Sequence, residues 1–252
     1  MSEKILKSES ISVSEKYKVG DAGASGVLDL DELDFVDDGY LEIHGDLKLH
    51  IKKLMNEKTS DRIPYEFYIV GDPGKSGQDS REGEDGSPGE KGIQTTVEII
   101  IDYLDTDIHV VTIGGRGGDG GSGIDGFRGG DGMDAEKGCC NGQYARGASG
   151  GDGTDGFGEG GRGGDGGDAP NVTIVWKKRK KGARILCESR PSEGGQGGCG
   201  GKGGKGGIGG RNGDGKSKAA DGKAGVSRQD GAKGTPGKTV DVKVIHDKEE
   251  KI

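Results

Sequence analysis

The chain has 252 residues, of which 57 are glycine, 28% are hydrophobic and 4% are aromatic. Glycine is about three times as frequent as in an average protein, so a large core of packed Leu, Phe and Trp side chains is hard to assemble. With 36 basic and 44 acidic residues the formal net charge is −8, which argues against nucleic acid and anionic membranes as the main partner.

The sequence shows no targeting segment and no cysteine framework. Its first residues, MSEKILKSES, contain no apolar run or cleavage signature of a secretory signal, and no stretch reaches the ~18 apolar residues of a membrane span. Cys139, Cys140, Cys187 and Cys199 form no C-x-x-C pair, so reduced thiols are expected rather than disulfides. We expect a cytoplasmic protein by default, with an extracellular or virion-associated location also open.

Strand patterns occur along the whole chain, usually in pairs. The N-terminal part contains ISVSEKYKV and GVLDLDELDF, and apolar residues then alternate with polar ones from Leu41 to Ile51. The same alternation, typical of half-buried strands, recurs at residues 97–103, and further strand patterns follow at residues 108–113, 171–176 and 239–245. ARILCES follows as the partner of the strand at residues 171–176. We expect a mainly β fold of short antiparallel strands in a sheet or sandwich, with little or no α-helix beyond a turn or two near IKKLMNEK.

The strand pairs and the glycine blocks that follow them form an internal repeat of roughly 65–75 residues. We divide the chain into an N-terminal β segment, three repeats of strands plus a glycine arm, and a C-terminal half-repeat that stops after one strand. Their expected bounds are residues 1–39, 40–94, 95–170, 171–237 and 238–252.

Glycine recurs with a period of three. The triplets from Gly114 read GGR, GGD, GGS, GID, GFR, GGD and GMD, those from Gly194 read GGQ, GGC, GGK, GGK, GGI and GGR, and those from Gly150 slip in phase once. Three residues per turn is the polyproline-II geometry, and six prolines are too few for a collagen triple helix. We expect bundled polyglycine-II helices that exchange backbone hydrogen bonds and turn every third residue to solvent.

In these triplets, over roughly half of its length, the chain resembles the polyglycine-II proteins, which include the snow-flea antifreeze protein and glycine-rich phage tail adhesins. The resemblance implies a fold more than an activity. Ice binding requires a flat face of small residues, whereas these triplets carry Asp, Lys and Arg.

Calcium is an alternative reason for the glycine pattern. Residues 120–128 and 150–158 match the nonapeptide G-G-x-G-x-D-x-U-x of calcium-binding β-rolls. The match predicts Asp125 and Asp155 as calcium ligands together with backbone carbonyls. Nine residues are also three triplets, so a triplet repeat mimics the motif, and its two phenylalanines would then cap the glycine layer.

Three further motif matches lack the context that they require. Gly210 to Ser217 reads G-x-x-x-x-G-K-S, and Gly147 to Gly151 reads G-x-S-x-G, but neither follows a strand or begins a helix. Arg116 and Arg162 lie in GGRGGDGG, where the Asp cancels the charge that RGG segments use on RNA. We expect no catalytic or cofactor-binding residue and no nucleic-acid partner.

Two surfaces are candidates for interaction. The basic segment after the strand at 171–176 is expected as a turn that either binds an acidic partner or is solvated; its residues are Lys177, Lys178 and Arg179. The C-terminal strand either completes the sheet of its own chain or adds to that of a neighbour; its apolar residues are Val240, Val242 and Val244.

These features favour a non-enzymatic structural or assembly protein that polymerises by strand addition. One alternative is an adhesin or receptor-binding module that presents loops such as residues 135–149 to a protein or glycan receptor. The other is a calcium-binding, β-roll-like protein. Self-association is the expected interaction, with no membrane span and no cofactor other than calcium in that second alternative.

Overall fold

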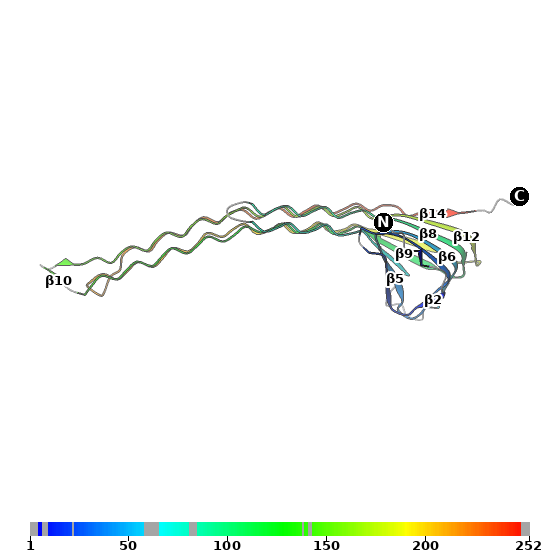
Figure 1. Ribbon diagram of the computed structural model, residues 1–252, viewed down its shortest axis with the longest axis horizontal. Coiled ribbons are helices and arrows are strands. Elements are labelled where there is room, and N and C mark those ends of the chain that lie inside the picture. The colour runs from blue at the N-terminus through cyan, green and yellow to red at the C-terminus, as the bar shows by residue number, and fades with distance from the viewer. Residues whose placement is uncertain are drawn as a thin grey trace.

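The computed structural model describes residues 5–6, 10–21, 23–57, 66–80, 85–137, 139–140 and 143–247. These residues form a β-sheet base from which a long glycine-rich arm projects (Figure 1). The described residues contain no α-helix, so the expectation of a mainly β protein is confirmed. Residues 51–56, in the segment near IKKLMNEK where a turn or two of helix is expected, belong to strand β6. No helix among them has the length and apolar character needed to cross a membrane.

The base consists of two parallel sheets. Sheet A contains β1 (Ile5–Leu6), β2 (Ser10–Val13), β4 (Ser25–Phe35), β6 (Asp46–Asn56), β8 (Thr96–Leu104), β12 (Asn171–Arg179) and β14 (Lys243–His246). Sheet B contains β3 (Lys16–Val19), β5 (Tyr40–His44), β7 (Phe67–Val70), β9 (Ile108–Ile113) and β13 (Ile185–Arg190). Among the strands that the structure describes, β10 (Cys139–Cys140) and β11 (Gln143–Tyr144) form the one antiparallel pair, and it lies at the far end of the arm (Figure 1).

The prediction of antiparallel strands is wrong for both sheets. Consecutive strands such as β8 and β9 are joined by a short turn, but they lie in different sheets and do not pair with each other. Each strand pairs instead with its equivalent in the next repeat, so that Leu49, Ile99 and Ile174 are in one parallel register. A short turn produces a hairpin only if both strands share a sheet; here it carries the chain around the core, and parallel neighbours follow from stacking identical repeats.

The core lies between the two sheets. Inward-facing aliphatic residues such as Leu49, Ile99 and Ile174 are fully buried at each level, and the rings of Phe35 and Phe67 meet edge to face at 5.4 Å between β4 and β7. Burying one such large side chain contributes about 1.5–3 kcal/mol. The base therefore supplies the hydrophobic stabilisation that glycine segments lack.

The arm arises where the chain returns from sheet B to sheet A. The return after β5 is the tight turn at Gly45, whereas the returns after β7, β9 and β13 are long glycine-rich excursions. We call these excursions arms 1, 2 and 3, each with an outgoing and a returning limb. The limbs are residues 71–80 and 85–95 in arm 1, 114–135 and 145–170 in arm 2, and 191–213 and 217–242 in arm 3.

Candidate functional site

The six limbs are held together by backbone hydrogen bonds that recur every third residue. The outgoing limbs lie side by side, since Gly74 N–H donates to Arg116 O at 2.9 Å and Gly117 N–H donates to Glu193 O at 3.0 Å. The returning limbs do the same, as in the 2.9 Å bond from Gly89 N–H to Arg162 O. This three-residue repeat is the one that the glycine period predicts for polyglycine-II segments.

The outgoing limbs form one layer of the bundle and the returning limbs form the other, and backbone hydrogen bonds join the two layers. Gly118 N–H donates to Glu90 O at 2.9 Å, and Gly164 N–H donates back to Gly118 O at 2.8 Å. Arm 1 is the shortest arm, so the bundle continues past it as the four limbs of arms 2 and 3 (Figure 1).

Glycine is required where arm 1 packs on arm 2. A Cβ atom on Gly118 would lie 1.9 Å from the carbonyl oxygen of Lys75. Such contacts place backbone directly against backbone, so any side chain at this position would separate the two limbs.

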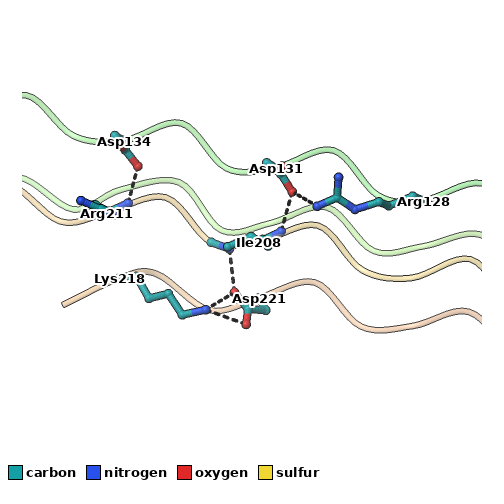
Figure 2. Close-up of polar contacts among 8 residues, drawn as sticks. Arg128, Asp131, Asp134, Ile208, Arg211, Lys218 and Asp221 are labelled. Carbon is teal, nitrogen blue, oxygen red and sulfur yellow. Dashed lines mark hydrogen bonds and ion pairs between the residues drawn. The ribbon is translucent and has the colours of Figure 1, made fainter.

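Aspartate side chains accept the N–H groups of non-glycine residues in the triplets of a neighbouring limb. Asp119, Asp125 and Asp131 each accept the N–H of the residue 77 positions later on arm 3, at 2.7–2.8 Å. Figure 2 shows the contact from Ile208 N–H to Asp131 and the equivalent contact, at 2.6 Å, from Arg211 N–H to Asp134. On the returning limbs Asp152 and Asp155 play the same part for Lys223 and Val226. The triplet Asp residues are therefore acceptors that fix the register of neighbouring arms.

The two predicted calcium ligands both belong to this set. Asp125 accepts Lys202 N–H at 2.8 Å, and Asp155 accepts Val226 N–H at 2.8 Å. Within the described ranges, no three His, Cys, Asp or Glu side chains gather in a way that suits a metal ion. Each aspartate already has a backbone partner that explains its place in the triplet.

Ion pairs one turn apart reinforce the same aspartates. Arg162 lies 2.6 Å from Asp165 and Arg128 lies 2.6 Å from Asp131, a spacing of three residues that suits a three-residue turn. The pKa of Asp165 is lowered, first by the hydrogen bond from Thr235 N–H and also by Arg162. Arg116 is bound by Asp119 in the same way, so both arginines that resembled those of RGG segments, Arg116 and Arg162, are paired within the arm.

The phase slip in the triplets is a local bulge. On one side of it Gly156 N–H donates to Val226 O, and on the other Gly160 N–H donates to Gln229 O, so the register shifts by one residue. Gly158 takes up the extra residue with a φ of +74°. Arg228 stands opposite, in place of a triplet glycine, and its Nε donates to Gly156 O at 2.9 Å.

The phosphate-loop match is the turn that ends arm 3. There the Asp214 carboxylate accepts the N–H groups of Lys216 and Ser217 at 2.9 and 3.0 Å, and the Ser217 hydroxyl at 2.6 Å. These are groups that a phosphate-binding loop would present to its ligand. The pKa of Asp214 is lowered by these bonds, that from the Ser217 side chain first, so the chain supplies its own anion.

The G-x-S-x-G match lies in the returning limb of arm 2 and not between a strand and a helix. Its first N–H, that of Gly147, donates to the side chain of Asn212 at 2.9 Å. Gly150 N–H donates to Ala220 O at 3.0 Å. This segment is part of the limb-to-limb bonding.

The C-terminal strand completes the sheet of its own chain. Val244 is in register with Ile174 of β12, and Val242 packs against the core. Val240 N–H donates to the Ser189 hydroxyl at 3.1 Å. The indole of Trp176 stacks on the His246 ring with 3.8 Å between centroids, which fixes the end of β14.

The predicted basic turn is part of strand β12. Lys178 and Arg179 are in register with Tyr103 and Leu104 of β8. Lys177 lies 3.0 Å from Asp102, and Arg179 lies over the Trp176 ring at 4.6 Å. The three residues are the last of the strand, and of them only Lys178 and Arg179 are exposed.

Three of the four strand histidines lie apart, each beside a carboxylate, and the fourth, His246, stacks on Trp176. His44 is 2.8 Å from Glu42, His50 is 3.2 Å from Asp102, and His109 is 3.8 Å from Glu188. The structure does not bring them together into one site.

An exposed apolar row on arm 2 goes beyond the sequence expectation, which was only that Phe127 and Phe157 cap the glycine layer. Where arm 1 packs on this limb, the corresponding triplet position is glycine, as at Gly118 and Gly121. Farther out the same position is occupied by Ile124, Phe127 and Met133, which are 39%, 69% and 80% exposed. Phe157 of the returning limb joins them, with 6.1 Å between its ring centroid and that of Phe127. The change from GGX to G-apolar-X triplets at GID, GFR and GMD was the available signal.

Comparison with protein-family models, with curated proteins and with solved structures finds no match to this chain.

Proposed function

We propose that the protein is a non-enzymatic structural scaffold in which the β base anchors a stiff, extended arm. The observation that carries this proposal is the ladder between arms 2 and 3, which runs without a gap from Gly117, at the base, to Ala135, near the far end. A limb bonded at every third residue to its neighbours cannot bend independently of them. The arm therefore transmits position and force from the base to its tip.

The length of the arm follows from its geometry. The outgoing limb of arm 2, residues 114–135, extends about 65 Å at ~3.1 Å per residue. Flexible glycine chains of that size are much more compact on average. A scaffold built in this way separates its tip from its base at little cost in hydrophobic core.

A second candidate function is receptor binding by the outer part of the arm. Phe127 and Met133 are exposed beyond the end of arm 1, and Tyr144, near the tip, is 55% exposed. Aromatic and methionine side chains are enriched in protein interfaces. This observation favours an adhesin or receptor-binding module with a protein or glycan receptor.

Small-angle X-ray scattering of the monomeric full chain tests the scaffold proposal. The expected result is a maximum dimension that exceeds the arm's about 65 Å by the size of the base. A profile of a compact base with a flexible tail would contradict it. Binding of receptor proteins or glycans that is lost in Phe127→Ser and Met133→Ser, with unchanged scattering, would establish the second function.

A further inference from the structure

The C-terminal end of the base is uneven by one strand. β1 and β2 both pair with β4, so the seven strands of sheet A make six levels, whereas sheet B has five. The additional level is β14, which pairs with β12 and has no counterpart beside β13. Among the described strands, β13 is therefore the last of sheet B and leaves one edge open.

Both strands at this end expose apolar side chains and backbone. Leu186 of β13 is 46% exposed, and Val244 and Ile245 of β14 are 45% and 47% exposed. Arg184 O accepts Ile108 N–H from β9. In a parallel ladder only every second residue of a strand bonds to a given neighbour. The residues between them, which include Cys187, therefore direct their backbone N–H and C=O groups to the open edge. An open, partly apolar edge is a template for pairing with another chain.

We propose that a second copy of this chain completes the end by a two-fold contact. The strands of the two sheets run in opposite directions, because each rung passes forward through sheet A and back through sheet B. A half-turn about an axis parallel to the strands exchanges the sheets and keeps the strand directions. β14 of each copy then fills the open position beside β13 of the other, in antiparallel pairing, and inward-facing side chains remain inward.

Charge supports this arrangement. Lys243 and Glu188 are both exposed and lie in the arm-side halves of β14 and β13. Within its own copy Glu188 is paired with Arg190, 2.7 Å away on the same strand. Lys243 precedes Val244, which is in register with the buried Ile174. Glu188 follows Cys187, which is in register with the buried Val110. Successive residues of a strand point to opposite faces, so Lys243 and Glu188 of the second copy would meet on the outer face with opposite charges.

The opposite, N-terminal end explains why the contact is two-fold and not an open chain of copies. There the first strands of sheet A, β1 and β2, and the first strand of sheet B, β3, start at the same level. Stacking that even end on the uneven C-terminal end would leave the position beside β13 empty. Two uneven ends fit together without a gap, which gives a closed dimer.

Size-exclusion chromatography with light scattering, over a range of concentrations, tests this inference with two charge reversals. The wild-type chain is expected to have twice the chain mass. Lys243→Glu and Glu188→Lys are each expected to be monomeric, because like charges then meet twice. An equimolar mixture of the two variants is expected to restore the dimer, because both contacts become complementary again.

Lys75→Glu, on arm 1, is the control with the same change of charge, and circular dichroism checks that each variant is folded. A wild-type monomer at every concentration would overturn the inference, as would an assembly that both reversals leave intact. Either failure would leave the scaffold proposal standing, because the scattering experiment measures the arm of a monomer.

Discussion

A methyl group on Gly121 would lie 1.8 Å from the carbonyl oxygen of Gln78. The next residue on the same face of that limb is Ile124, which lies past the end of arm 1 and is 39% exposed. The face therefore changes from glycine to large apolar residues at the point where the neighbouring limb ends. These large residues also prevent a further glycine limb from packing there.

Gly121→Ala is expected to destabilise the contact between arms 1 and 2 by about 1–3 kcal/mol, because the new methyl group forces two backbones apart. Gly130→Ala is the matched control, since it has the same triplet position beyond arm 1 and nothing within 4 Å of its Cβ. Amide exchange of Gly74 and Gly77 should accelerate only in the first variant. Equal effects of both substitutions would show that the close packing is absent.

Asp125→Ala should weaken the register between arms 2 and 3, whereas Asp125→Asn should preserve it, because the amide oxygen still accepts Lys202 N–H. The expected loss for Ala is about 1 kcal/mol, the net value of one hydrogen bond. Exchange of the Lys202 amide measures it directly. If added calcium raised the melting temperature of the wild-type chain, and both substitutions reduced that rise equally, the result would instead support metal binding.

Gly158→Ala should cost about 1–2 kcal/mol, because an L-residue is strained in the left-handed region. Gly158→Asn should cost less, since asparagine tolerates that conformation. Thermal unfolding of the two variants compares them. If alanine proved as stable as glycine, the bulge would not have the backbone conformation described.

The arm should lose stability in acid. The pKa of Asp165 is lowered by Thr235 N–H and Arg162, and that of Asp221 by Lys218 and then by Gly209 N–H. A carboxylate whose pKa is lowered on folding stabilises the fold above its unfolded pKa of about 3.9, and this stability disappears as the pH falls through the folded pKa. Unfolding between pH 6 and pH 2.5 measures the effect. Asp165→Asn should have a weaker dependence, and a stability that rose towards low pH would contradict this account.

The sequence predicts the mainly β character well, and its strand patterns and glycine period are both read by local rules. Alternation in YLEIHGDLKLH identifies half-buried strands, and triplets of GGX indicate three residues per turn. Even the phase slip after Gly150 is visible, and the structure assigns it to Gly158.

Strand partners were not predictable in this way. The turn between Leu104 and Ile108 is short enough for a hairpin, and only the repeat of the whole unit shows that β8 pairs with β12 instead. The role of Asp125 was hidden for a similar reason. Its partner, Lys202, is 77 residues away, and the offset depends on the lengths of two arms and the strands between them.

Amide hydrogen exchange across arms 2 and 3 of the full-length chain tests the central claim most directly. An ordered, hydrogen-bonded arm predicts slow exchange at the amides that bond arm 2 to arm 3, which are those of Gly117, Gly120, Gly123, Gly126, Gly129 and Gly132. It predicts slow exchange also at amides that bond to the other limbs, such as Gly118 and Gly121. It also predicts protection of the residues whose N–H groups bind aspartate, such as Lys202 and Ile208. Exchange of these amides at the rate of an unfolded chain, with the β base still protected, would show that the glycine segments are flexible and would contradict the account.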